Sequence, residues 1–369
     1  MRRVLPLIAA AACGGDAQTP APIRFLHTFG PEETELFNAT MAERGIAVEA
    51  KLAPFARGQQ VIGEILRAGT SCPDLIRIDA TWLPGLVAHD LLLPVPAELQ
   101  HEDWLPEVQS PNRMMGVPQT IDGLIVLRDE ATPAPRSSSI ADLVAAARAS
   151  AHAERPHPLE LRADGYWFVP WLRGAGSDLD LDHIGHPGAV DALAGFAALF
   201  GDVAPAPPPS GSEAPEELRR WLQHDTAYWV TGPWQVGALR ERERLQITAL
   251  AGAPRGGQML VVPKCAKDPA AGWRLAGELT SVPVATKFAG AFATVPTRQA
   301  ALAAAPPLVQ AEYQALRGAE PLARSPVTPL LFDDLNPAIA AVIAHDATAQ
   351  EAIDGVRRGW GRLAKRDPR

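Results

Sequence analysis

Cysteine and tyrosine are scarce in this chain. The sequence has 3 of each in 369 residues, too few cysteines for the disulfide framework that holds small secreted proteins together. Cys13 lies near the N-terminus, which leaves Cys72 and Cys265 in the body of the chain. In an oxidising compartment these two thiols could form a disulfide, or each could be buried separately. The sequence leaves both arrangements open.

The common catalytic and cofactor-binding motifs are also absent. The sequence contains no phosphate-binding loop, no H-E-x-x-H zinc motif, no C-x-x-C pair and no nucleophile elbow. The glycines within Arg173–Gly176 do not form a dinucleotide fingerprint. One acidic and histidine-rich segment comes nearest to a metal site, but it lacks the glycine and the closing glutamate of a calcium loop. We interpret this segment as a solvated loop and expect no metal and no cofactor. Its members are Asp178, Asp180, Asp182, His183 and His186.

Excess positive charge and long apolar runs are lacking as well. The net charge is −8, which argues against nucleic acid or an anionic membrane surface as the main partner. After the N-terminal segment, no apolar run is long enough to span a bilayer. Apolar residues nevertheless make up 47% of the 369 residues. A chain of this length and composition can bury two cores, so we expect two domains.

The N-terminus has the layout of a secretory leader. Arg2 and Arg3 precede an apolar run, Val4–Ala12, which ends in small residues before Cys13. A cysteine directly after the cleavage site is what a bacterial lipoprotein needs, because its thiol accepts the lipid. We expect residues 1–21 to form a lipoprotein signal peptide and tether, with lipidation at Cys13. The alternative is an ordinary signal peptide in which the cysteine is incidental.

Strand and helix patterns alternate in the first part of the chain. Ile23–Phe29 has the pattern of a strand, and Gly30-Pro31 begins a helix with glutamates in its first turns. Ile46–Leu52 alternates as a second strand does, a helix follows over Gln59–Ala68, and Asp74–Asp79 predicts a third strand. Strand, helix, strand, helix and strand at this spacing predict a parallel sheet covered by helices.

The chain beyond Arg128 predicts a second set of elements. Thr132–Pro135 has the composition of a linker, and Ser139–Asp142 is a capping box that begins an alanine-rich helix. Ala204–Ser212 is rich in proline and predicts a surface loop. Further strands are expected over 121–127, 227–230, 247–250 and 259–262, and further helices over 187–200, 216–223, 268–279 and 336–365.

Several short segments occur in an order that is typical of one family. Arg24–Phe29 is followed by a glutamate-rich helix, and Ile62–Gly69 is followed by Pro73-Asp74-Leu75 and Asp79–Trp82. Later segments are Val117–Leu124, Gly232–Trp234, Leu279–Ser281, Val295–Arg298 and Glu351-Ala352. In this order and spacing, the chain resembles the extracellular solute-binding proteins of family 1. These are the periplasmic receptors of sugar importers such as those for maltose and trehalose.

The resemblance implies an α/β protein with the periplasmic-binding-protein type II fold, in which two discontinuous α/β lobes surround a ligand cleft. On that pattern, lobe one comprises residues 22–127 and 252–298, and lobe two comprises residues 128–251 and 299–369. Ligand contacts from both lobes then favour closure about the hinge. The closed receptor delivers a saccharide, such as a disaccharide, to the transmembrane subunits of an ABC permease.

The resemblance also bears on location and assembly. It implies a monomer in the periplasm that uses no cofactor, makes or breaks no covalent bond and binds no nucleic acid. Its attachment to the membrane is expected through the lipid on Cys13 alone.

This resemblance explains why the chain has nine tryptophans, because a sugar-binding cleft needs aromatic surfaces. The C–H face of a pyranose packs on an indole ring, while its hydroxyls need fixed polar partners. Trp82 follows Asp79 at the carboxyl end of a predicted strand, where open α/β sheets bind ligands, so we expect a platform and a hydroxyl acceptor there. The alternative is that Trp82 belongs to the core. Trp234, at the start of a helix, and Tyr166 with Trp167 are the other aromatic candidates.

Four more residues are expected as polar contacts of the ligand: His27, Glu32, Asp122 and Arg324. Arg324 is included because an arginine in this position resembles one near the family's site. The other tryptophans are assigned to the structure (Trp104, Trp221, Trp273 and Trp360) or left undecided (Trp171 and Trp229).

Three alternatives remain open. A secreted glycoside hydrolase also combines tryptophans with carboxylates, and Asp79 and Asp122 could serve as its acid pair. A receptor of the same fold could bind a polyol, glycerol phosphate or peptide, since the sequence does not show which residues line the cleft. A lipoprotein could also have kept the fold as a scaffold and lost the ligand.

Overall fold

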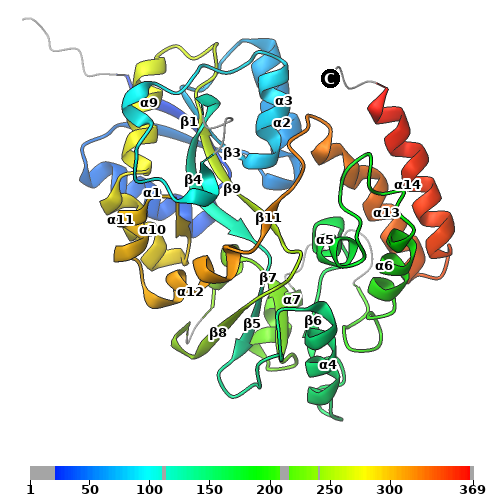
Figure 1. Cartoon of the computed structure of the whole chain (residues 1–369). Helices are drawn as coiled ribbons and strands as arrows, with labels where there is room; N and C mark the ends of the chain where they lie inside the picture. Colours follow the sequence, from blue (N-terminus) through cyan, green and yellow to red (C-terminus); the bar gives the residue numbers. More distant parts are fainter. Residues whose placement is uncertain (1–20, 110–113, 208–215, 240–241, 366–369) are drawn as a thin grey trace, which may run out of the picture.

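The computed structural model describes residues 21–109, 114–207, 216–239 and 242–365 (Figure 1). The predicted signal peptide with Cys13 and part of the proline-rich loop lie outside these residues. Two β-sheets with helices packed around them form two lobes, and the chain passes between the lobes near the centre of the molecule (Figure 1). None of the described helices has both the length and the apolar character needed to cross a membrane.

The first three strands form as the apolar alternation predicts. β1 (Ile23–His27) pairs in parallel with β2 (Val48–Leu52) on one side and with β3 (Leu75–Asp79) on the other. The connecting helices are α1 (Pro31–Glu43) and α2 (Phe55–Ala68). This arrangement confirms the predicted parallel sheet with helical connections.

Strand β9 returns to the first sheet from far along the chain. The seven-stranded sheet has the order β10-β4-β9-β3-β1-β2, with β11 also paired to β9. β9 (Pro254–Val261) is antiparallel to both β4 (Val117–Gly123) and β3. β10 (Val295–Pro296) and β11 (Glu320–Pro321) are short additions. The lobe that contains this sheet is therefore built from separate stretches of sequence.

The second lobe contains a four-stranded sheet in the order β6-β7-β5-β8. Its members are β5 (Ile125–Asp129), β6 (Leu159–Glu160), β7 (Tyr228–Thr231) and β8 (Leu245–Ala249). β5 is antiparallel to both β7 and β8, so this sheet is mostly antiparallel.

The chain's C-terminal helices belong to the second lobe. α13 (Leu331–Ile343) and α14 (Ala349–Ala364) pack together, and both contact α6 (Gly188–Ala197), while α13 also contacts α5 (Gly165–Gly174) (Figure 1). Thr348 and Glu351 form a capping box at the start of α14. The region predicted as one helical tail is thus two helices.

The other described helices complete both lobes. α12 contacts β8 and β5 of the second sheet as well as β4 and β10 of the first, so it lies against both sheets. The bounds are α3 (Leu83–Ala88), α4 (Ile140–Ser150), α7 (Glu216–Leu222), α8 (Pro233–Val236), α9 (Pro269–Leu279), α10 (Val282–Phe292), α11 (Gln299–Ala304) and α12 (Pro307–Leu316), with short turns η1 (Ala80–Trp82) and η6 (Thr328–Leu330).

Both faces of the first sheet are buried. Phe25 and Leu75 belong to one apolar cluster, whereas the next residues along each strand, Leu26 and Ile76, belong to another. Neighbouring strand residues point to opposite faces, so each cluster fills the space between one face of the sheet and its helices. The tryptophans assigned to structure or left undecided are buried, or they pack against one of the protein's apolar clusters: Trp104, Trp171, Trp221, Trp229, Trp273 and Trp360.

The chain passes between the lobes at three adjacent places: at Gly123-Leu124, at Leu250–Pro254 and after β11. The Leu124 N–H donates to the Pro254 carbonyl oxygen at 3.4 Å, and the Glu320 N–H donates to the Ala253 carbonyl oxygen at 3.1 Å. A Cβ on Gly123 would lie 2.5 Å from the Pro254 carbonyl oxygen. Only glycine therefore allows the first two passages to come this close.

Cys72 and Cys265 form a disulfide, which decides between the two arrangements that the sequence left open. Their Cα atoms are 5.8 Å apart, and the bond joins positions separated by 193 residues. Close by in the sequence, Asp74 pairs with Arg24 at 2.6 Å and accepts a hydrogen bond from the Asp268 N–H at 3.1 Å. The disulfide and this carboxylate both join the early and late segments of the first lobe.

Removing the disulfide should lower the free energy of unfolding. We expect the Cys72→Ser, Cys265→Ser double variant to lose about 2–4 kcal/mol, because the bond restricts the unfolded chain. Urea denaturation followed by circular dichroism measures the loss. Wild-type protein treated with a reducing agent should show a similar loss, and an unchanged midpoint in the double variant would contradict the stabilising role.

Candidate ligand-binding cleft

A cavity of about 1600 Å³ lies between the two lobes. In the first lobe its walls come from α2 and from the carboxyl ends of β3 and β4, and in the second from α13 and the N-terminal ends of α5 and α8. Most residues predicted as ligand contacts line this cavity. They are Glu32, Asp79, Trp82, Asp122, Tyr166, Trp167 and Trp234.

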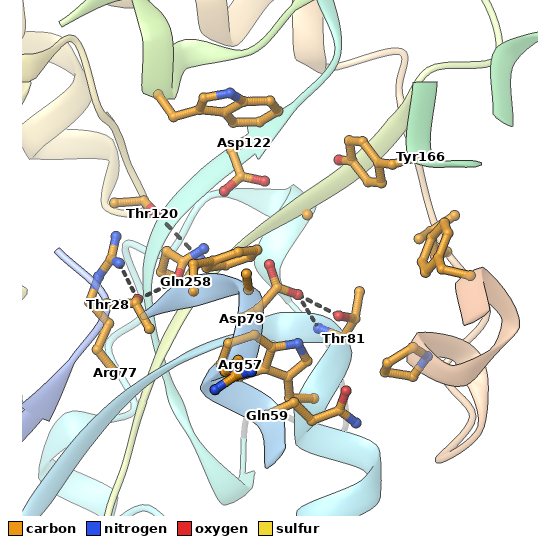
Figure 2. Close-up of a pocket in the computed structure, with 18 of the residues that line it drawn as sticks. Thr28, Arg57, Gln59, Arg77, Asp79, Thr81, Thr120, Asp122, Tyr166 and Gln258 are labelled. Carbon is orange, nitrogen blue, oxygen red and sulfur yellow. Dashed lines mark hydrogen bonds between the residues drawn. The ribbon is translucent and has the colours of Figure 1, made fainter. Parts of the chain in front are cut away.

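The register of β9 brings Asp79, Asp122 and Gln258 together. Gln258 lies opposite Asp79 of β3, and Gly256, two positions earlier in β9, lies opposite Asp122 of β4. Residues two apart share one face of a sheet. The two carboxylates and the amide therefore point in the same direction from three neighbouring strands and line the cavity (Figure 2).

Asp122 has room because Gly256 carries no side chain. A Cβ on Gly256 would lie 2.8 Å from Oδ1 of Asp122 and 3.7 Å from the hydroxyl oxygen of Tyr166. The carboxylate of one lobe and the phenol of the other thus approach the same point above β9. Figure 2 shows both side chains directed toward the cavity.

Asp79 is held by the turn that follows it. Its Oδ1 accepts hydrogen bonds from the Thr81 N–H at 2.8 Å and from the Thr81 hydroxyl at 2.5 Å (Figure 2). An aspartate before a helical turn commonly caps the turn in this way. The carboxylate is therefore fixed at the carboxyl end of β3 before any ligand arrives.

Burial and mutual repulsion affect both carboxylates. Burial, together with the charge of Asp79, raises the pKa of Asp122 to about 7, and burial also raises the pKa of Asp79. The buried Arg77 does not neutralise them by direct contact, because its guanidinium donates to Gln119 Oε1 at 2.7 Å and to Thr28 Oγ1 at 2.7 Å. The cavity floor is therefore acidic, and Asp122 changes protonation near neutral pH.

The start of α5 positions Tyr166 in the second lobe. Asp164 caps the helix by accepting a hydrogen bond from the Tyr166 N–H at 2.8 Å, and Oδ1 of Asn336 accepts one from the Gly165 N–H at 2.7 Å. The Tyr166 hydroxyl donates to the Pro254 carbonyl oxygen at 3.4 Å. Burial, then the negative charges of Asp122 and Asp79, raises the pKa of Tyr166 well above its ordinary value, so the phenol keeps its proton.

Trp234 presents an open aromatic surface. Its side chain is 42% exposed, and its ring centroid lies 6.4 Å from that of Tyr166 and 6.1 Å from that of Trp167. Trp167 is fixed because its Nε1 donates to the Val230 carbonyl oxygen at 2.8 Å. Trp234 is therefore supported by two other rings while one surface stays accessible.

Trp82 belongs both to the cavity lining and to the core. It is 7% exposed and shares an apolar cluster with Ile76. Its ring centroid lies 5.3 Å from that of Phe55. A Cβ on Gly58 would lie 2.5 Å from the Trp82 ring, so this glycine lets α2 approach the indole. Trp82 is therefore a core residue that also lines the cavity, and its role as a ligand platform stays a prediction.

His27 and Arg324 do not line the cavity. His27 is 1% exposed and packs among the rings of Phe25, Phe29 and Phe37. Its Nδ1 accepts a hydrogen bond from the Phe29 N–H at 3.2 Å, and burial, then the charge of Arg77, lowers its pKa to about 4. His27 is thus a neutral core residue, because it shares a strand face with Phe25. Arg324 is exposed beside the lining residues Leu322 and Pro326.

Some lining residues were not predicted. Thr28 and Thr81 adjoin predicted residues, and Asp164 stands where a helix cap is expected, so local patterns could have indicated them. Gln258 and Asn336 have no such signal. Both reach the cavity through contacts between segments distant in sequence.

Asp122→Asn should stabilise the unliganded protein at pH 8. A carboxyl group with a raised pKa in the folded state stabilises the fold when protonated, and this contribution is lost as the pH rises from about 4 to about 7. The amide does not titrate, so the variant should melt a few degrees higher at pH 8, and the difference should shrink toward pH 5.

Differential scanning calorimetry at both pH values measures this difference. Asp346→Asn, in an exposed turn, is the matched control and should change the Tm little. If Asp122→Asn and wild type melt together at pH 8, the carboxylate does not carry the electrostatic cost inferred from its burial.

A family profile described as bacterial extracellular solute-binding protein matches residues 35–316. No curated protein matches in sequence. The GacH receptor of Streptomyces glaucescens, solved unliganded and with acarbose, has a TM-score of 0.82 at 21% identity, covering 93% of this chain and 98% of that one.

Two other solved structures are similar to the same extent. The maltose-bound MalE3 of T. maritima has a TM-score of 0.78 at 21% identity, covering 93% of this chain and 99% of that chain. A Thermotoga lettingae ABC transporter solute-binding protein bound with α-D-tagatose has a TM-score of 0.77 at 19% identity, with coverage of 93% and 99%. These similarities identify the fold as periplasmic-binding-protein type II, with two discontinuous lobes around a cleft. Because the profile spans most of its length, the chain belongs to the bacterial extracellular solute-binding proteins.

Proposed function

We propose that this chain is the sugar-binding protein of an ABC importer. The observation that carries the proposal is the composition of the cleft, in which Trp82 and Trp234 supply aromatic surface and Asp79, Asp122 and Gln258 supply hydrogen-bonding groups. The C–H face of a sugar packs on aromatic rings, and its hydroxyls require fixed donors and acceptors. Relatives of this fold solved with maltose, acarbose and tagatose support a sugar ligand.

The size of the cleft favours an oligosaccharide, such as a disaccharide. Its volume of about 1600 Å³ exceeds the roughly 300–1,000 Å³ of ordinary small-ligand pockets. Each lobe also contributes an aromatic pair, Phe55 with Trp82 in the first and Tyr166 with Trp234 in the second. A ligand of two or more rings can contact both pairs.

Binding is proposed to act through hinge closure. The cleft takes its polar and aromatic groups from both lobes, so a ligand that contacts both is bound more tightly when they approach. We assign lobe one to residues 22–123 and 254–321 and lobe two to residues 124–253 and 322–365. The boundaries expected from the sequence, at 127 and 298, move to these positions because β5 pairs within the second sheet and β11 pairs with β9 of the first. The closed monomer then presents its sugar to the transmembrane subunits of the permease.

We propose that the protein releases its sugar without changing it chemically. Asp79 and Asp122 are a carboxylate pair of the kind that glycoside hydrolases use, but the Tyr166 phenol and the Gln258 amide beside them are hydrogen-bonding partners suited to holding hydroxyls. A chromogenic glycoside incubated with the protein checks this, since release of the chromophore would revive the hydrolase alternative.

Sugar binding should raise the Tm, and Trp82 and Trp234 should each contribute to the binding affinity. A ligand at a hundred times its Kd adds about 2.7 kcal/mol of stability, so a thermal-shift screen of mono-, di- and trisaccharides identifies the ligand.

Trp234→Ala and Trp82→Ala should each weaken the affinity for that ligand roughly tenfold, equal to about 1.4 kcal/mol, in isothermal titration calorimetry. A flat screen points to the non-sugar alternatives.

Leu222→Ala is the matched control for the tryptophan variants. Leu222 is 51% exposed and lies on α7 away from the cavity lining, so its removal should leave affinity unchanged. Equal affinities of wild type and both tryptophan variants would remove the proposed platforms.

The location is proposed to be the periplasm, with a lipid on Cys13 as the anchor. The proposal rests on the basic, apolar and small-residue order of the first thirteen residues. Cys13→Ser should move the protein from the membrane fraction to the soluble fraction, and mass spectrometry of the wild-type N-terminus should find an acylated cysteine. An unmodified mature chain that starts elsewhere would exclude the anchor.

A further inference from the structure

One arginine outside the cleft contacts two of the three passages between the lobes. Arg173 lies in the last turn of α5, and its side chain is 9% exposed. Its Nη1 lies within hydrogen-bonding distance of the carbonyl oxygens of Ala253 at 3.3 Å and Glu320 at 3.0 Å, and its Nη2 donates to that of Pro321 at 3.0 Å. Nε donates to Oδ1 of Asp178 at 2.9 Å.

These carbonyl groups stand where the chain changes lobes. Ala253 belongs to the passage that leads into β9, and Glu320 and Pro321 form β11, after which the chain enters the second lobe. The guanidinium therefore joins two segments that are distant in sequence, and the Asp178 carboxylate balances its charge. A planar group with five N–H donors can serve such divergent acceptors, whereas a lysine ammonium is a single point.

The passage at residues 250–254 also rests directly on α5. Gly252 has a φ of +74°, and a Cβ there would lie 3.1 Å from both the Pro170 carbonyl oxygen and Cβ of Arg173. A side chain at this position would separate the passage from the helix. The contact thus depends on glycine as well as on arginine.

The opposite end of α5 lies in the cleft. Tyr166 and Trp167, in its first turn, line the cavity, and the Tyr166 hydroxyl donates to the carbonyl oxygen of Pro254. Gly165–Gly174 is ten residues long, or about 15 Å. One short helix therefore has cleft residues at one end and the Arg173 contacts at the other.

We propose that Arg173 is a positioning residue that restricts the angle between the lobes and thereby sets how strongly ligand contacts at Tyr166 and Trp167 favour closure. The guanidinium acts through the passages and touches no ligand. The ligand part of this proposal rests on the proposed sugar-binding function, whereas the restriction of the lobe angle does not. A protein whose binding-competent geometry is populated only fractionally shows a correspondingly weaker apparent affinity.

The restriction can be measured without ligand. Spin labels on Ala39→Cys in α1 and Ala194→Cys in α6, both exposed, report the distance between lobes by double electron–electron resonance. Arg173→Ala should broaden the distance distribution of the unliganded protein, and Arg173→Lys should restore it only in part. Arg148→Ala, which removes an exposed arginine paired with Asp202, is the matched control and should leave the distribution narrow.

The effect of Arg173 on ligand binding is measured as the dissociation rate constant koff, by stopped flow with the sugar found in the thermal-shift screen. Arg173→Ala should raise koff roughly fivefold while equilibrium unfolding in urea shows that the variant remains folded. Should that variant fail to fold, Arg173→Lys and Asp178→Asn decide the same question through smaller changes in the distance distribution.

Distributions identical to wild type in the folded Arg173 and Asp178 variants would overturn the proposal. A broader distribution with unchanged koff would overturn its coupling to the ligand. If wild type binds no sugar, the proposed function fails, while the unliganded distance measurements still decide the role of Arg173.

Discussion

The antiparallel return of β9 between β3 and β4 is the constraint on which the rest of the molecule depends. Its register sets Gln258 beside Asp79 and gives Asp122 the space above Gly256. Its first residue, Pro254, receives hydrogen bonds from the Leu124 N–H and the Tyr166 hydroxyl. A slip of one residue would turn every β9 side chain to the other face, so the first core, the cleft floor and the passages between the lobes all depend on one set of strand pairings.

The middle of each strand contributes to stability, and its carboxyl end contributes to the binding cleft. The middle of β1 and β3 carries Phe25, Leu75 and Ile76 into two cores that cover both faces of the sheet. The carboxyl ends of β3 and β4 carry side chains that oppose stability, because a desolvated Asp122 lies beside the charge of Asp79. Sites built for ligands commonly hold such strain. The apolar burial in the two cores offsets the free-energy cost of these carboxylates.

The sequence could predict the strand ends but not every partner that meets them. Asp79 and Trp82 follow an apolar alternation that marks where β3 stops, so their place at the cleft could be predicted from local physics. The same alternation assigns His27 to the face of Phe25, and the structure places it in that core rather than at the cleft. Gln258 was not predictable because only the register of β9 brings it to Asp79, and Asn336 because it reaches Gly165 across 171 residues. The second-lobe aromatic residues were indicated by resemblance to a family rather than by periodicity.

The Cys72–Cys265 bond closes a covalent loop that contains all four strands of the second sheet. The second sheet is therefore, in covalent terms, an insertion within a ring whose closure lies in the first lobe, whereas α13 and α14 of the second lobe lie beyond that ring. A protease that cut the backbone once, for example between α4 and β6, would produce two polypeptides still joined by sulfur and by the pairing of β9. In an oxidising compartment such a nicked molecule would remain one particle with an assembled first lobe, and only reduction would let its halves separate.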